Sequence, residues 1–171
     1  MNIFKTFNDI FIKNLIVWIF YIISFSSFEQ VKEFQDLVVF SFNLHMIIVY
    51  FYVLKFPENL GTGHIFLAGI INDVVIGTPL GTSSLSFLVL TFFTSYMRNA
   101  TLRSKMTSEW VTFIPALFFS NLVYFIIINN FSHLSFYYIE LLRSTFFTFL
   151  FFPFFYILFK NYQKVISQGK E

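Results

Sequence analysis

The sequence of 171 residues contains no cysteine and few charged residues. The absence of cysteine excludes disulfide bonds, thiolate metal sites and cysteine nucleophiles. Charged residues make up 12% of the chain, whereas a soluble domain carries about 25%. This scarcity argues against a soluble globular fold. It also argues against intrinsic disorder, which requires high charge and low hydrophobicity.

The charges that are present show no pattern typical of a nucleic-acid or metal site. The formal net charge is only +2, so the chain offers no basic surface for nucleic acid. The histidines His45, His64 and His133 lie in three different segments, and none pairs with a carboxylate at helical ligand spacing, so we expect no metal. No Ser/His/Asp arrangement, phosphate loop or nucleotide motif is visible. We therefore predict a protein that is not an enzyme and uses no cofactor.

Long apolar runs dominate the sequence. Apolar residues make up 57% of it, and the mean hydropathy is +0.72. A membrane-spanning helix needs about 20 predominantly apolar residues. The runs predict six spans, at residues 14–28, 37–54, 63–76, 79–97, 110–129 and 134–159. We expect an all-α integral membrane protein, with about six transmembrane helices in a single membrane domain over residues 1–171. Because the third run is short, a re-entrant hairpin of the third and fourth runs is the alternative.

The lysines and arginines outside these runs are distributed unevenly. With six spans, nine lie on one side of the membrane: Lys5, Lys13, Lys55, Arg98, Arg103, Lys105, Lys160, Lys164 and Lys170. Only Lys32 lies on the other side. Since positive charge is retained in the cytoplasm, both termini are predicted to be cytoplasmic.

Three ionisable residues fall inside predicted spans, where each is costly and calls for an explanation. They are Asp73, Glu140 and Arg143. Gly69, Asp73 and Gly77 are spaced four apart, so they share one helix face that allows a neighbouring helix to come close. We hypothesise that Asp73 meets the Glu140/Arg143 pair across the bundle. This cluster is a structural ion pair, a proton or ion relay, or a buried contact to another membrane protein.

Glycine and proline mark the predicted helix ends. We expect Gly77 to stop the third helix, Pro79 to begin the fourth and Gly81 to permit a close approach. Pro153 is expected to kink the sixth helix, because it leaves the carbonyl group near Phe149 without its helical donor.

The stretch GIINDVVIGTPLGTSSL at residues 69–85 resembles the most recognisable segment of the rod shape-determining protein MreD family. That family carries G-x-x-x-D, then G-x-P-L-G and a leucine-rich helix. These positions correspond to Gly69, Asp73, Gly77, Pro79, Leu80, Gly81 and Leu85.

The resemblance implies a non-enzymatic subunit of the cell-elongation machinery in the bacterial inner membrane. Such a subunit associates with an MreC-like protein, and through it with MreB, RodA and a class B penicillin-binding protein. The implied role is maintenance of rod shape and of lateral peptidoglycan synthesis. The hairpin around Gly77 and Gly81, with the face around Asp73, would then bind a partner's transmembrane or juxtamembrane segment.

Two transport functions are the alternatives. MreD-like proteins are similar to the S-component fold of energy-coupling vitamin transporters, whose members bind a small molecule. Their first helix usually carries Ala-x-x-x-Ala, whereas residues 14–28 here contain no alanine. A small secondary transporter would use Asp73 and Glu140 for proton coupling, and would be favoured by inverted repeats, which the sequence does not show.

Overall fold

A computed structural model describes residues 17–25, 42–58, 60–100, 106–131 and 138–168. Every regular element within these ranges is a helix, as the sequence predicts. Residues 17–25 are helical, and the longer helices are α2 (Leu44–Lys55), α3 (Thr62–Ile76), α4 (Thr82–Ala100), α5 (Met106–Phe131) and α6 (Tyr138–Gln168). Parts of the predicted spans, at residues 14–16, 26–28, 37–41 and 134–137, lie outside the described residues.

Helix α2 forms the centre of the bundle. All residues from 45 to 53 are buried, on every side of the helix. A helix that is apolar all round is stable only when other elements surround it. Aromatic rings make these contacts: Tyr50 lies 4.6 Å from Phe113 of α5 and 5.4 Å from Phe152 of α6, and His45 lies 5.6 Å from Phe20, between ring centroids.

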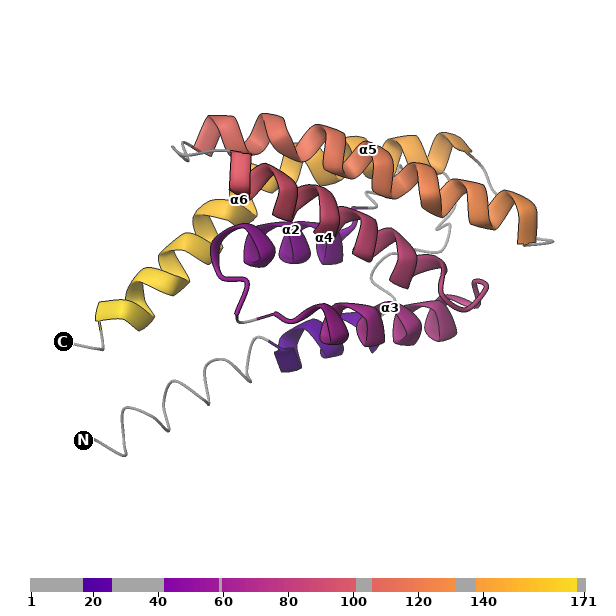
Figure 1. Ribbon diagram of the computed structural model, residues 1–171, viewed down its shortest axis with the longest axis horizontal. Helices are drawn as coiled ribbons and strands as arrows, with labels where there is room; N and C mark the ends of the chain where they lie inside the picture. The colour runs from indigo at the N-terminus through magenta and orange to yellow at the C-terminus, as the bar shows by residue number, and fades with distance from the viewer. Residues whose placement is uncertain (1–16, 26–41, 59, 101–105, 132–137, 169–171) are drawn as a thin grey trace, which may run out of the picture.

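Helix α4 joins the other helices, because it packs against α2, α3 and α5. Figure 1 shows α5, α4 and α2 one below the other, with α3 and residues 17–25 at the lower side. Helix α6 packs against α5 and α2. The C-terminal ends of α2 and α4 and the N-terminal end of α5 lie at one end of the bundle, and the α3–α4 turn lies at the other (Figure 1).

The outward faces of α5 and α6 are apolar. On α5 the exposed residues include Val111, Ile114, Phe118, Leu122 and Ile126; on α6 they include Leu142, Phe146, Leu150, Phe154 and Ile157. These residues recur every three or four positions, so each set forms one stripe along its helix. Exposed apolar surface of this extent is typical of a protein in contact with lipid.

Among the described residues, two helical segments are long and apolar enough to cross a membrane, Met106–Phe131 and Leu141–Tyr162, fewer than the six predicted. Helices α2 and α3 are apolar but have only 12 and 15 residues, so they extend about 18 and 22 Å. Helix α4 is long enough, but it carries many hydroxyl side chains. Several of them are buried against neighbouring helices: Ser83, Ser84, Ser86, Thr91 and Thr94.

Three helix starts differ from the predicted ones. Helix α2 begins at Leu44, whereas the second span was predicted from residue 37. The Asn43 side chain accepts from the Met46 N–H group and caps this start.

Helix α4 begins at Thr82, so the prediction that Pro79 begins it is wrong. Gly81 has a φ of +96°, and a left-handed residue cannot lie inside a right-handed helix. Helix α5 begins at Met106, four residues before the predicted start of the fifth span at Trp110.

Proline 153 lies inside α6, which continues on both sides of it. Because proline has no N–H group, the carbonyl oxygen of Phe149 loses its helical donor, as the sequence indicates. The indole Nε1 of Trp110 on α5 donates to that oxygen at 3.0 Å. The two side chains also stack, with ring centroids 5.0 Å apart. An interhelical hydrogen bond therefore replaces the missing bond within α6.

Candidate functional site

The α3–α4 turn contains most of the residues that the sequence analysis singled out. Helix α3 ends at Gly77, which has a φ of +80° in the left-handed region. Glycine adopts this conformation without the steric cost that a Cβ atom would bring. The N–H groups of Gly77 and Thr78 both donate to the carbonyl oxygen of Asp73, at 2.9 and 3.0 Å. Gly77 thus stops the third helix as predicted.

The carboxylate of Asp73 closes this turn. The residue is fully buried, and its Oδ1 accepts hydrogen bonds from Thr78 Oγ1 at 3.0 Å and from the Ser83 N–H at 2.8 Å. Its Oδ2 accepts from the Gly81 N–H at 2.8 Å. These N–H groups belong to the start of α4, where helix donors lack helical partners and the macrodipole favours negative charge. A side chain from α3 therefore caps the N-terminus of α4.

The small-residue face of α3 packs tightly, as predicted, and its neighbour is α4. A Cβ atom on Gly69 would lie 2.5 Å from the Cα atom of Ser84, so only glycine fits. Asn72 Nδ2 donates to Ser83 Oγ at 3.1 Å, and Ser84 Oγ donates to the Phe66 carbonyl oxygen at 2.9 Å. The face around Asp73 is thus occupied by the chain's own next helix.

Leu80 differs from the other residues of this turn. Its side chain is 73% exposed, whereas Pro79 is half-buried and its carbonyl oxygen accepts a hydrogen bond from the Thr82 N–H at 3.1 Å. Gly69, Asp73, Gly77 and Gly81 each have a role within the fold. The exposure of Leu80 leaves it free to contact something outside the chain.

Asp73 was expected to meet the Glu140/Arg143 pair, and its expected contact with Arg143 is wrong, because no ion pair joins these two described residues. The side chain of Glu140 lies outside the described part of the chain. The Asp73 carboxylate is satisfied by donors within ten residues of it, while Arg143 is exposed on α6. Helix α6 packs against α5 and α2. Glu140 lies on the first turns of α6, three residues before Arg143.

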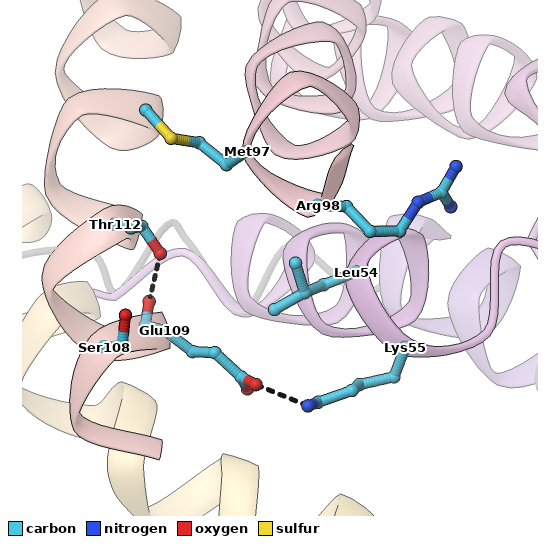
Figure 2. A pocket seen from close by; sticks show the side chains of 7 residues that line it. All are labelled: Leu54, Lys55, Met97, Arg98, Ser108, Glu109 and Thr112. Atoms are coloured by element: carbon cyan, nitrogen blue, oxygen red, sulfur yellow. Dashed lines mark hydrogen bonds and ion pairs between the residues drawn. The ribbon is translucent and has the colours of Figure 1, made fainter. Parts of the chain in front are cut away.

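A second polar site, which the sequence analysis did not identify, lies at the opposite end of the bundle. The Nζ of Lys55, at the end of α2, forms an ion pair with Oε1 of Glu109, in the first turn of α5. Glu109 is only 2% exposed. The Tyr50 hydroxyl donates to the Glu109 carbonyl oxygen at 2.8 Å and thereby fixes this turn to α2. Figure 2 shows the Glu109 side chain reaching across from α5 to Lys55.

This ion pair borders a cavity of about 170 Å³ between α2, α4 and α5. The lining residues are Leu54, Lys55, Met97, Arg98, Ser108, Glu109 and Thr112 (Figure 2). Arg98 donates from Nη1 to the carbonyl oxygen of Val53 at 3.1 Å. Oε2 of Glu109 is buried and has no hydrogen-bond partner among the described residues.

One signal in the sequence was available for this site. The predicted topology places Lys55 and Glu109 on the same side of the membrane, one at the end of a span and one at the start of another. Glu109 was assigned to a polar loop because the fifth helix was expected to begin after it. The pairing of two residues 54 positions apart could not be predicted from the sequence.

Comparison with known protein families shows to which family this chain belongs. The family described as rod shape-determining protein MreD matches residues 9–162, nearly the whole sequence. The chain belongs to the MreD family. Its matched region contains both the turn at Asp73 and the cavity at Glu109. No curated protein and no solved structure matches the chain, so the predicted similarity to the S-component fold receives no support.

MreD membership agrees with the general character of this structure. The family is membrane-associated and determines rod shape, and the described residues form an all-helical bundle with two helices able to cross a membrane. MreD proteins are structural and are not known as enzymes. Among the described residues, no group of three or more His, Asp or Glu side chains is arranged to hold a metal ion.

Proposed function

We propose that this protein is a non-enzymatic scaffold that helps to hold the bacterial elongation machinery together during lateral peptidoglycan synthesis. Membership of the MreD family supports this role. We further propose six transmembrane segments in one domain of the cytoplasmic membrane, with both termini in the cytoplasm. Two observations support this topology. Lysine and arginine are unevenly distributed between the two sides, and the consecutive helices α3, α4 and α5 run in alternating directions (Figure 1).

The observation that carries the scaffold proposal is the exposure of Leu80 on a turn whose backbone is held by hydrogen bonds to the Asp73 carboxylate. A large apolar side chain at 73% exposure on a fixed backbone is already arranged for contact, so binding costs little ordering entropy. Val74, three residues before Gly77 on α3, is also 66% exposed. In the proposed topology this surface lies at the outer face of the membrane.

The proposed partner is an MreC-like protein, through a transmembrane or juxtamembrane segment that contacts Leu80. Through that protein the scaffold would be linked to MreB, RodA and a class B penicillin-binding protein. Asp73 acts as a positioning residue in this proposal, because its carboxylate is buried and bonded to the turn rather than available to a partner. The proposal needs neither a metal nor nucleic acid.

Co-purification tests this proposal. The tagged protein is expressed with the MreC-like protein of the same organism, and recovery of the pair in mild detergent is compared for the wild type and Leu80→Ala. The matched control is Leu142→Ala, since Leu142 is 67% exposed on α6, which packs against α5 and α2. We expect Leu80→Ala to reduce recovery about tenfold, as for an interface hot spot, and the control to leave it unchanged. Equal recovery with both variants would refute the proposed surface.

A further inference from the structure

We propose that the cavity between α2, α4 and α5 binds the headgroup of a phospholipid with a primary ammonium group, as in phosphatidylethanolamine. The inference goes beyond the scaffold function. It relies on the bundle lying in a membrane but not on any protein partner. The observation behind it is the buried oxygen Oε2 of Glu109, which borders the cavity without a hydrogen-bond donor.

The cavity lies where lipid headgroups are expected. Lys55 ends α2, Arg98 lies in the last turn of α4, and Glu109 lies in the first turn of α5. These three helix ends gather at the end of the bundle opposite the α3–α4 turn (Figure 1). In the proposed topology this end faces the cytoplasm. Basic pockets between helices at that depth are suited to phospholipid headgroups.

Glu109 selects for a cationic hydrogen-bond donor. Its Oε1 is already paired with Lys55, so the remaining acceptor is Oε2. A buried carboxylate oxygen without a donor is costly, and a ligand that supplies an N–H group removes this cost. An ammonium group brings a full positive charge as well as its N–H donors, so it attracts the carboxylate more strongly than a neutral hydroxyl group does. A quaternary ammonium, as in phosphatidylcholine, has no N–H group to donate.

The two cationic side chains beside Glu109 make the cavity complementary to the phosphate of the same headgroup. A phosphate carries the opposite charge to Lys55 and Arg98, and both side chains line the cavity. The guanidinium group of Arg98 has five N–H donors in total, so it can bind phosphate while Nη1 stays bonded to Val53. Since a water molecule takes up about 30 Å³ in the liquid, a cavity of about 170 Å³ has room for an aminoethyl group.

Tyr156 is the intramolecular competitor for Oε2. It is 4% exposed on α6, and its ring lies 6.0 Å from the Nζ of Lys55. Its hydroxyl group interacts with the Glu109 carboxylate both by charge and as a side-chain hydrogen-bond donor, while Oε2 itself has no partner among the described residues. A rotation of its hydroxyl group toward Oε2 would satisfy the carboxylate without any lipid. The Tyr156→Phe variant removes this possibility, so lipid selectivity should be retained or increased in it.

The test is lipid retention by the purified full-length protein, measured by native mass spectrometry in competition. The probes are phosphatidylethanolamine, its N-methylated series up to phosphatidylcholine, and phosphatidylglycerol, all with identical acyl chains. We expect the fully methylated headgroup to bind at least about tenfold more weakly than the primary amine, since one charge-assisted hydrogen bond is lost. Equal retention across the series, as for a site that holds only water, would overturn the proposal. Retention of phosphatidylglycerol that equals or exceeds that of phosphatidylethanolamine would also overturn the proposal.

Substitution of Glu109 gives an independent check. Glu109→Gln keeps the side-chain shape but removes the charge, so the preference for the primary amine should disappear. The matched control is Glu58→Gln, since Glu58 is an exposed glutamate three residues after Lys55 and does not line the cavity. A preference that persists in Glu109→Gln would exclude the cavity as its source. The methylated series on the wild type needs no variant, so the proposal stays testable if Glu109→Gln fails to fold. Neither measurement involves the MreC-like protein. Failure of the lipid proposal is therefore distinguishable from failure of the scaffold proposal.

Discussion

At the residue scale, Asp73 illustrates how an apolar bundle accommodates one buried carboxylate. Three donors surround it, and two of them are backbone N–H groups at the start of α4. The charge therefore replaces the helical partners that these N–H groups lack. The side chain was predicted to be buried in a helix contact, and it is. Its bonding partners were not predicted correctly, because a carboxylate inside a span suggests an opposite charge as its partner, whereas backbone N–H groups at a helix start meet the same need.

Asp73→Asn should lower the thermal unfolding midpoint of the protein in detergent. Asparagine keeps the shape, but its NH2 group faces one of the donors that the carboxylate accepts from, and the charge at the helix N-terminus is lost. We expect a cost of about 1.5–3 kcal/mol, since hydrogen bonds to a charged group are weakened. The control is Glu58→Gln, which removes a carboxylate from an exposed position. Equal midpoints for the two variants would contradict the capping role.

At the element scale, the close approach of α3 and α4 depends on the absence of a side chain at Gly69. Helices in lipid associate through packing and hydrogen bonds rather than through the hydrophobic effect, so small residues at the contact are important. The hydroxyl groups of α4 serve the same purpose on its other side, where Ser86 Oγ and Ser120 Oγ of α5 lie 2.7 Å apart.

Gly69→Ala should destabilise the bundle by about 1–3 kcal/mol, because its Cβ atom would overlap the backbone of Ser84 and force the helices apart. Gly63→Ala in the same helix is the matched control, since nothing lies within 4 Å of its added Cβ atom. There the gain in helix propensity should leave stability unchanged or raise it by about 0.5–1 kcal/mol. Thermal unfolding of both variants measures the difference, and a similar loss in both would argue against the close contact.

The bond from Trp110 to the carbonyl oxygen of Phe149 predicts a coupling between two helices. Trp110→Phe leaves that oxygen without a donor and should cost about 1–3 kcal/mol. In a Pro153→Ala background the alanine N–H group supplies the missing helical donor, so the same substitution should cost less. A double-mutant cycle of unfolding free energies measures the coupling. Additive effects would show that the proline and the indole act independently.

At the scale of the whole molecule, the proposed topology has a test that the composition makes simple. The chain has no cysteine, so each introduced cysteine is the only thiol in the protein. Leu80→Cys and Asn130→Cys should react with a membrane-impermeant maleimide in intact cells, since Leu80 in the α3–α4 turn and Asn130 in the last turn of α5 are both exposed and both lie at the proposed outer end of the bundle. Glu58→Cys should react only after the membrane is permeabilised. Labelling of Glu58→Cys in intact cells, or protection of the other two, would contradict the six-span topology.

The predicted helix ranges were most accurate where the signal was local. The third span was expected at residues 63–76 and α3 covers Thr62–Ile76, since Gly77 gives a clear C-terminal signal. The start of α5 was missed by four residues because Thr107, Ser108 and Glu109 resemble a loop. They are helical because Glu109 pairs with Lys55 and its carbonyl oxygen accepts from Tyr50, contacts that only the folded bundle provides.

The sequence by itself determined the helical class, the MreD relationship, the end of α3 and the small-residue face of α3. Each depends on composition, on spacing along one helix or on a short motif, and these are properties of neighbouring residues. Only the tertiary structure decided that Asp73 caps α4, that Trp110 compensates for Pro153 and that Glu109 borders a cavity. These results depend on which helices lie side by side and on how they are rotated. Helical periodicity shows which face of a helix is buried, but not which side chain of another helix that face will meet.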